Sequence, residues 1–372
     1  MTMPVLQQLE LFRTYVSPEA IERVNQVLRS GWLSEGRVVK EFEEALTKRL
    51  GFVNPVAVNS GTSALHLALV IAGVGPGDEV ILPAQTFIAT GLAVLMQQAK
   101  PVFVDINPTT GNLDPAAAAR AITPRTKAIM AVHWAGYPCE LQELNAIADR
   151  AGIPVIEDAA HALGATYQGQ PIGSVSRFTA FSFQAIKHLT TGDGGALCCR
   201  NDADANTAMA RRWFGVDRLN SRPSELGERI YDIRNVGYKY HMNDLAAAVG
   251  VGNLEGFDQR LARRQAIGAF YRQQLARVSG LELLQLASNR THAYWLLTIL
   301  VERREEFIRK LAESGIPASV VHLRIDRNTV FGGLQDLPGQ QEFDARQVSL
   351  PVHDGLTDDD AARVVQAIRA GW

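Results

Sequence analysis

Lys187 is the residue with the clearest capacity for covalent chemistry. It follows the strongly apolar run FTAFSF (178–183) and precedes a Gly-Asp-Gly-Gly turn at 192–195. Loss of water around a lysine beside such a run favours the neutral amine. A neutral amine attacks carbonyl carbons and can form an imine. Taken alone, the segment also allows a lysine that simply faces solvent.

A Ser-Gly-Thr-Ser turn at 60–63 joins an apolar run to a helix-like stretch. Gly61 lets a ligand approach the backbone closely, and Thr62 and Ser63 add hydroxyl groups. The N-terminus of the following helix offers unpaired N–H groups and the positive end of the helix dipole, which together suit a phosphate. Ser182 could donate to the same phosphate. The alternative is an N-cap that only closes a tight turn.

Two carboxylates, Glu157 and Asp158, end the apolar run PVIED at 154–158. Ligands in open α/β sheets bind at this end of the strands. A carboxylate there can hold a cationic ring nitrogen, or it can cap the next helix. Together, the phosphate cradle, Asp158 and an imine-forming Lys187 describe a pyridoxal phosphate site. We therefore expect pyridoxal phosphate as the cofactor, with pyridoxamine phosphate as its amino-carrying form.

The elements that must position these residues alternate between apolar runs and helical stretches. Runs that are continuously apolar indicate strands buried on both faces. Seven runs fit this description: 55–59, 79–83, 101–105, 127–132, 154–158, 178–183 and 195–199. Helix-like stretches lie between the early ones, at 64–73, 86–98 and 140–152. The sequence therefore predicts an α/β fold with a mostly parallel seven-stranded sheet flanked by helices.

The flanking segments predict a second, smaller domain. Two helices, at 17–30 and 38–50, precede the strands, and each ends at a glycine. Residues 201–275 look mainly helical, with a polar, irregular insert at 217–235. After them we expect a strand at 295–301, a helix at 304–315, the run 316–321 and a last helix at 357–370. We expect a large cofactor-binding domain over 1–255 and a small C-terminal α/β domain over 256–372.

The composition is that of an ordinary globular protein. Apolar residues make up 47% and charged residues 20% of the 372 residues, which excludes a mostly disordered chain. The 37 basic and 39 acidic residues give a formal charge of -2, so nucleic acid is not an expected partner. No apolar run reaches the roughly 18–20 residues of a membrane span, and the first residues lack a signal-peptide pattern. We therefore expect a cytoplasmic protein that does not bind membranes.

Metal and nicotinamide cofactors are not expected from the motifs. The three cysteines, Cys139, Cys198 and Cys199, are odd in number and lack paired CxxC spacing. The histidines form no HExxH motif. The glycine-rich stretch GVGPGD at 73–78 follows a helix and precedes a strand, which is the reverse of a dinucleotide-binding fingerprint.

Seven motifs spread over nearly the whole chain carry a family resemblance. They are SGWLSEGRVVKEFE (30–43), NSGTSALHLAL (59–69), LPAQTFIAT (82–90), VHWAGYPCEL (132–141), IEDAAHALGA (156–165), FSFQAIKHLTTGDGG (181–195) and VGYKYHMNDLAAAVGVGNLE (236–255). With these motifs the chain resembles a DegT/StrS-type sugar aminotransferase, a branch of the fold-type I pyridoxal phosphate enzymes. One branch of that family replaces the Schiff-base lysine with histidine and acts as a dehydratase. Lys187 therefore argues for amino transfer.

The resemblance implies roles in cofactor binding. Lys187 would bind the cofactor as a Schiff base and then move protons between cofactor and substrate, while Asp158 would keep the pyridine nitrogen protonated. Phe87 would stack on the cofactor ring, and His161 would lie near the ring oxygen. Gly61, Thr62 and Ser182, with Ser63 in the same turn, would hold the phosphate.

The resemblance also implies a homodimer whose active sites are shared between subunits. Lys239, in the segment GYKYHMND, would contact the phosphate of the neighbouring subunit's cofactor. Many family members carry Asn and Arg where this chain has Lys239 and His241. Near the C-terminus, Ile325 replaces the Asn of an Arg-Asn-Asp run that many members share.

The expected substrates are an amino acid donor, in the first place glutamate, and a keto-sugar. The sugar is expected to be nucleotide-linked and to carry its ketone at carbon 3 or 4. Trp32, His322 and Arg324 are the candidate substrate contacts. Two alternatives stay open: a pyridoxal phosphate aminotransferase for a keto-cyclitol or keto-octulosonate, and a regulatory protein that binds cofactor or sugar without turnover.

Overall fold

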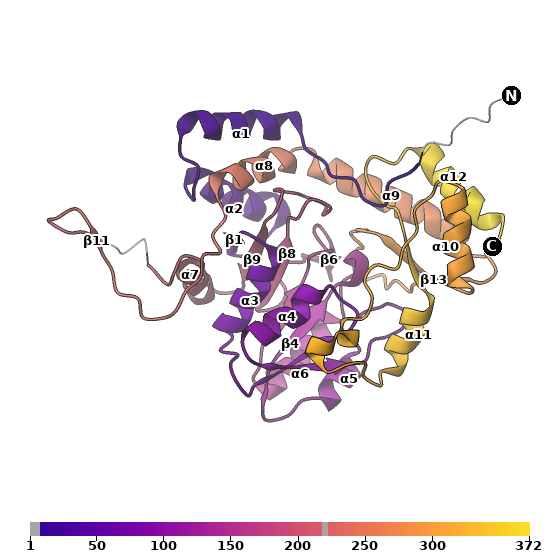
Figure 1. The fold of residues 1–372 in the computed structure, drawn as a ribbon, viewed down its shortest axis with the longest axis horizontal. Helices are drawn as coiled ribbons and strands as arrows, with labels where there is room; N and C mark the ends of the chain where they lie inside the picture. The colour runs from indigo at the N-terminus through magenta and orange to yellow at the C-terminus, as the bar shows by residue number, and fades with distance from the viewer. Residues whose placement is uncertain (1–7, 218–221) are drawn as a thin grey trace.

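A seven-stranded sheet forms the centre of the larger part of the molecule (Figure 1). The computed structural model describes residues 8–217 and 222–372. The strand order is β1-β9-β8-β5-β4-β2-β3. The strands are β1 (Pro55–Val58), β2 (Glu79–Pro83), β3 (Lys100–Val104), β4 (Thr126–Val132), β5 (Val155–Asp158), β8 (Phe178–Ser182) and β9 (Gly195–Cys199). Only β9 runs antiparallel to its neighbours, β1 and β8; the pairs among β3, β2, β4, β5 and β8 are parallel. The predicted mostly parallel sheet is confirmed at all seven runs.

Helices cover both faces of this sheet, which explains why its strands are apolar on both sides. All five residues of β2 and of β9 are buried. Two apolar cores result, one on each face, with Phe42 and Phe181 in one and Leu67 and Phe178 in the other. The helices of this part are α1 (Pro18–Ser30), α2 (Arg37–Leu50), α3 (Gly61–Ile71), α4 (Ile88–Met96), α5 (Pro115–Arg120), α6 (Leu141–Ala151), α7 (Asp202–Arg211) and α8 (Asp244–Leu254).

Asp244 joins two of the sequence motifs by capping a helix that is distant in the chain. Helix α2 has no side-chain cap of its own at Gly36. The Asp244 carboxylate instead accepts hydrogen bonds from the backbone N–H groups of Gly36 at 2.9 Å and Val39 at 3.0 Å. An acid at a helix N-terminus satisfies unpaired donors and favours the helix dipole. The contact holds α2 against α8 and the loop that precedes it.

A three-stranded antiparallel sheet organises the C-terminal part, on the right of Figure 1. Its strands are β12 (Leu281–Leu283), β13 (Leu297–Val301) and β14 (Gln347–Leu350), packed with α9 (Phe257–Leu275), α10 (Arg304–Glu313), α11 (Pro338–Arg346) and α12 (Asp358–Arg369). Gly256, in the left-handed region at φ 67°, separates α8 from α9. We place the proposed domain boundary there. The run at 316–321 forms only a single bridge, between Ser319 and Ser349.

The first described residues pack on the C-terminal part and not on the larger sheet. Leu9 belongs to the apolar core of the small sheet, and its N–H donates to the carbonyl of Gly315 at 3.0 Å. His353 Nε2 lies 3.1 Å from the carbonyl oxygen of Glu10. The predicted assignment of this N-terminal segment to the large domain therefore does not match its contacts.

The polar insert predicted at 217–235 contains a hairpin that projects away from the body of the molecule (Figure 1). Its strands are β10 (Arg222–Pro223) and β11 (Arg229–Ile230), and residues 218–221 lie outside the described part. We call residues 222–236 the arm. Short elements elsewhere are β6 (Thr166–Tyr167), β7 (Gln170–Pro171), η1 (Trp134–Gly136), η2 (Ile325–Arg327) and η3 (Thr329–Phe331). No helix in the described part of the chain is both long and apolar enough to cross a membrane.

Candidate active site

A cavity of about 400 Å³ lies where β5 and β8 end and α3 begins. Carboxyl ends of neighbouring parallel strands meet at one edge of a sheet, which is where ligands of open α/β sheets bind. The cavity brings together eight of the predicted site residues: Gly61, Thr62, Phe87, Asp158, His161, Ser182, Lys187 and His322. They come from segments separated by up to about 260 residues in the chain.

The cradle at 60–63 is the first turn of α3. Ser60 is the N-cap, and its Oγ accepts from the N–H of Ser63 at 3.1 Å. The Ser63 hydroxyl donates to Asn59 Oδ1 at 2.7 Å, and Ser63 is not among the residues that line the cavity. A Cβ on Gly61 would lie 2.9 Å from the Cβ of Ser182, closer than real side chains pack. Glycine is therefore required for α3 to start against β8, which puts Ser182 beside the helix N-terminus.

The Asp158 carboxylate is held by groups that the sequence did not single out. Its Oδ2 accepts from Thr90 Oγ1 at 2.7 Å, and its Oδ1 accepts from the N–H of Ala160 at 3.2 Å. The Thr90 hydroxyl also lies 2.6 Å from the hydroxyl of Thr86. Both threonines lie in the LPAQTFIAT motif, and this motif is the sequence pattern from which they could have been predicted as site residues. With these contacts the carboxylate of Asp158, which is 7% exposed, has a fixed orientation.

Lys187 follows β8 and extends its amine over Trp295, with Nζ 3.8 Å from a ring centroid. Burial lowers the pKa of Lys187 to about 7, against an opposing effect of the Asp158 charge. An amine with a pKa near neutrality is present in both protonation states at physiological pH. It can therefore act as a nucleophile and can also accept and donate protons.

Aromatic rings form the walls of the cavity beside Lys187. The imidazole of His161 stacks on Trp295, with centroids 3.8 Å apart and planes 8° apart. Burial lowers the pKa of His161 well below its ordinary value. Phe87, just before α4, is 52% exposed and leaves ring surface open toward the cavity. Trp295 was missed by sequence reasoning, because nothing around it distinguishes it from an ordinary core tryptophan.

Besides Ser63, three of the predicted residues do not line the cavity of this subunit. Trp32 is 81% exposed in the loop between α1 and α2. Arg324 is buried and forms an ion pair with Asp326, in which its Nε donates at 2.7 Å. The ammonium of Lys239 lies 5.4 Å from the ring of Trp213. Substrate or cofactor contacts of these three residues stay predictions.

The segment that carries Lys239 nevertheless runs beside the phosphate cradle. Residues 238–241, called the strap below, bond to the residue before the cradle: Asn59 donates through its N–H to the carbonyl of Tyr240 at 2.7 Å and through Nδ2 to the carbonyl of Lys239 at 3.2 Å. The Tyr240 hydroxyl lies 3.2 Å from His66 Nδ1, one turn further along α3. The strap and the cradle therefore form one unit.

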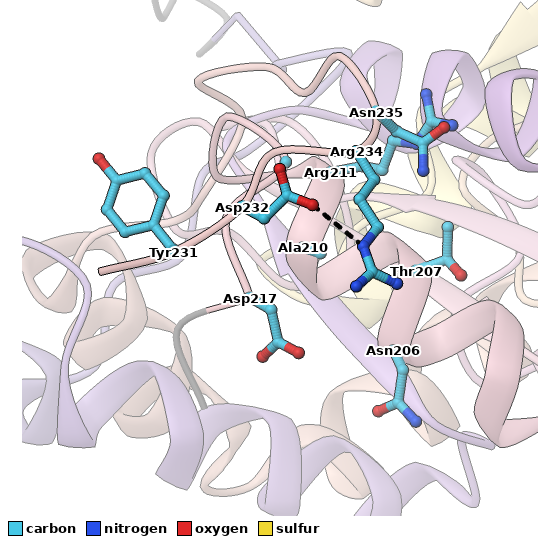
Figure 2. Close-up of a pocket in the computed structure, with 10 residues that line it drawn as sticks. Asn206, Thr207, Ala210, Arg211, Asp217, Tyr231, Asp232, Arg234 and Asn235 are labelled. Carbon is cyan, nitrogen blue, oxygen red and sulfur yellow. Dashed lines mark hydrogen bonds and ion pairs between the residues drawn. The ribbon is translucent and has the colours of Figure 1, made fainter. Parts of the chain in front are cut away.

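Figure 2 shows a second hollow, of about 560 Å³, between α7 and the arm. Asn206 and Thr207 come from α7, and Asp232 and Arg234 come from the arm. Arg234 Nε donates to Asp232 at 3.2 Å, and both side chains are largely exposed. This hollow has no lysine, histidine or cysteine in its described lining. Within residues 8–217 and 222–372, no group of three or more His, Cys, Asp or Glu side chains is placed to bind a metal ion.

The donor set of the first cavity fits pyridoxal phosphate. A helix N-terminus that only glycine can start faces Ser182 and suits a phosphate dianion. Asp158 can pair with a protonated ring nitrogen, and the Lys187 amine can bond to an aldehyde carbon. Phe87 offers an exposed aromatic face for a planar ring. No other cavity described above combines these groups.

Comparisons with known proteins match the chain over almost its whole length. Residues 15–369 match the family described as "DegT/DnrJ/EryC1/StrS aminotransferase family". The GDP-perosamine synthase of Caulobacter vibrioides is 37% identical, with 93% of each chain covered. The sugar aminotransferase CalS13 of Micromonospora echinospora superposes with a TM-score of 0.93 at 38% identity, covering 98% of this chain and 100% of that one. The PLP form of Spr1654 from Streptococcus pneumoniae gives a TM-score of 0.90 at 29% identity, with 98% of both chains covered.

Proposed function

The chain belongs to the DegT/DnrJ/EryC1/StrS aminotransferase family, and we propose that it moves an amino group from glutamate to the ketone of a nucleotide-linked sugar. It is a sugar aminotransferase, and its cofactor is pyridoxal phosphate. The nucleotide-linked sugar is supported by the 37% identical GDP-perosamine synthase, whose product carries a nucleotide. We propose a ketone at carbon 3 or 4 of a deoxysugar as the acceptor.

The observation that carries this proposal is the position of the Lys187 amine. It lies in one cavity with the phosphate cradle and with Asp158, and burial lowers its pKa to about 7. Pyridoxal phosphate, when bound, supplies a conjugated ring that withdraws electrons from the reacting carbon. The protein's part is to hold the ring, to keep its nitrogen protonated and to move a proton.

Each of these tasks has a candidate group. Gly61 and Thr62 at the start of α3 and the Ser182 hydroxyl hold the phosphate, and Phe87 packs on the ring. Asp158, oriented by Thr90, stabilises the protonated nitrogen as a charge-assisted pair. Lys187 would accept the proton from the donor's α-carbon and would donate a proton to the acceptor carbon that receives the amino group. Its pKa near 7 allows both steps at neutral pH.

Substrate contacts are proposed for His322, Trp32 and Arg324, with different support. His322 lines the cavity beside Phe87, with ring centroids 5.1 Å apart. Trp32 is fully available for contact with a partner subunit or substrate, since it is 81% exposed. Arg324 is paired with Asp326, so its contribution would be to hold the loop that carries His322.

A panel of ketones tests the proposed substrate class. We expect the purified enzyme, loaded with cofactor and glutamate, to convert nucleotide-linked keto-deoxysugars at least about 100-fold more efficiently than keto-cyclitols or keto-octulosonate, since this difference of about 2.7 kcal/mol corresponds to a few substrate hydrogen bonds. Product masses identify the aminated sugar. Equal or better conversion of a non-nucleotide ketone would replace the proposed substrate. Failure of glutamate to alter the absorbance of the bound cofactor would leave only a binding role.

We also propose a homodimer in which the arm and the side chain of Lys239 reach the partner subunit. Three large apolar side chains on the arm, those of Leu226, Ile230 and Val236, are 89%, 64% and 73% exposed, which supports an arm that a second copy of the chain covers. A second copy of the chain would cover them and would bring Lys239 toward the partner's phosphate cradle.

The dimer is tested by a charge placed on the arm. Sedimentation should give twice the chain mass of 40.6 kDa for the wild type. Ile230→Glu should weaken the dimer about tenfold or more, because the buried glutamate would have no counter-charge. Leu334→Glu, at an exposed position away from the arm, is the control and should keep the dimer. A wild type that is monomeric and fully active at assay concentrations would contradict the shared site.

A further inference from the structure

The main-chain carbonyl of His322 accepts hydrogen bonds from two buried glutamine side chains. Gln85 Nε2 donates to it at 2.9 Å and Gln347 Nε2 donates to it at 3.0 Å. Gln85 lies between β2 and α4 of the large sheet, and Gln347 is the first residue of β14 in the small sheet. The loop that carries His322 is therefore held from both parts of the molecule.

A third glutamine fixes the first of these donors. Gln340 Nε2 donates to Gln85 Oε1 at 2.7 Å, and the backbone N–H of Gln340 is itself bound by Asp105 at 2.8 Å. Gln85 is 1% exposed, and Gln340 and Gln347 are fully buried. Burying a glutamine costs free energy, because the side chain loses hydration and conformational freedom. Hydrogen bonds to the amide offset this cost. Both polar atoms of the Gln85 amide are used, so its orientation is fixed.

The group that this network holds in place is a neutral imidazole at the wall of the cavity. Burial lowers the pKa of His322 to about 4, and the nearby Lys187 charge acts in the same direction. The ring therefore carries no charge at neutral pH. A neutral imidazole donates and accepts single hydrogen bonds, which suits a hydroxyl or a ketone better than a carboxylate or a phosphate.

We propose that Gln85 and Gln347 are positioning residues that fix the His322 ring against an uncharged hydroxyl or carbonyl oxygen of the amino acceptor. The proposal rests on the proposed function, since the acceptor is the keto-sugar of that reaction. The proposal assigns the His322 ring to only one of the two half-reactions, the one that uses the keto-sugar. The acceptor uses the His322 wall, and the amino acid donor, whose recognition groups are carboxylates, does not depend on it.

A double-mutant cycle tests whether Gln347 acts through His322. Gln347→Met keeps the side-chain length and removes the donor. We expect His322→Ala to lower kcat/KM for the keto-sugar about tenfold, the value of one hydrogen bond, and Gln347→Met to lower it about threefold. In the His322→Ala background, Gln347→Met should have no further effect. Glutamate conversion of the bound cofactor should change less than twofold in Gln347→Met.

A second measurement needs neither substrate nor cofactor. Hydrogen–deuterium exchange at the imidazole C2 carbon, followed by mass spectrometry of the cofactor-free protein, reports the pKa of His322. Gln347→Met should raise that pKa toward the ordinary histidine value, because a loosened ring gains water. Gln341→Met, on the exposed side of α11, is the matched control and should change nothing.

The outcomes separate this inference from the proposed function. Additive losses, or equal losses with glutamate and with the sugar, would overturn the positioning role. An unchanged His322 pKa in Gln347→Met would also overturn it. If Gln347→Met does not fold, Gln85→Met takes its place in both measurements. A wild type that converts no keto-sugar would refute the proposed function, and the exchange measurement would still decide whether the glutamines hold the His322 ring.

Discussion

Lys187→Ala should lose nearly all aminotransferase activity, by about 10³–10⁴-fold, which is the usual effect of removing an acid–base group that is also the covalent anchor. The variant should still bind pyridoxal phosphate through the cradle and Asp158, and the absorbance of the lysine-bound cofactor should disappear. Turnover with glutamate and the best keto-sugar, together with absorbance spectra, are the measurements. Lys127→Ala, at an exposed position of β4, is the control and should behave as the wild type. Substantial turnover in Lys187→Ala would exclude Lys187 from both roles.

The same lysine predicts a pH-dependent stability of the cofactor-free protein. Its pKa is about 7 in the folded chain and 10.5 in the absence of burial, so between these values the unfolded chain binds the extra proton. Burial of the group therefore destabilises the fold fully below pH 7 and ceases to do so above about 10.5. Cofactor-free Lys187→Met should unfold at a higher temperature than the wild type at pH 6, and the difference should vanish near pH 11. If the difference in unfolding temperature between Lys187→Met and the wild type did not change with pH, the lowered pKa of Lys187 would be contradicted.

Asp158→Asn should have the second largest effect, a loss of about 10²–10³-fold in turnover with the fold and cofactor binding retained. Asparagine has nearly the same shape, and its amide oxygen can still accept from Thr90, whose hydroxyl now donates at 2.7 Å. The negative charge that stabilises a protonated ring nitrogen is lost, so the ring withdraws electrons less strongly. Both half-reactions should slow equally, because both need the same electron sink.

Thr90→Val is the companion to that variant. It keeps the Asp158 charge and removes only the hydroxyl that orients it, so we expect a loss of a few-fold, comparable to one hydrogen bond. Thermal unfolding of both variants checks that the fold is intact. Near-normal turnover in Asp158→Asn would remove Asp158 from the proposed role.

The central sheet and the reactive groups could be predicted from the sequence because their signals are local. The strands are buried on both faces, so each reads as a continuous apolar run, and all seven runs are strands. Asp158 and Lys187 lie at or just after the ends of such runs. Gly61 begins a helix shortly after another apolar run, at 55–59, so a short stretch of sequence is enough to predict the phosphate cradle.

The remaining parts depend on contacts between distant residues. Thr90 and Trp295 reach the site only because α4 and the segment before β13 pack there. Thr90 lies in the LPAQTFIAT motif, but nothing in the sequence around Trp295 distinguishes it from an ordinary core tryptophan. The short strands β12 and β14 gain their order by pairing with β13, over three and four residue pairs, which is too little for a clear local pattern. The buried partner Asp326, only two positions away, holds Arg324 in its loop, and the substrate contact of Arg324 stays a prediction.

Helix α4 carries two of the groups that a bound ring would meet. Phe87 stands at its N-cap and Thr90 lies in its first turn, where it holds Asp158. The ring that would stack on the cofactor and the hydroxyl that orients Asp158 therefore move together with helix α4. A tilt of α4, whether from an altered neighbour or from domain closure, would displace both groups at once. Variants of this helix should therefore change the affinity for the vitamin and its electronic activation together, and not one without the other.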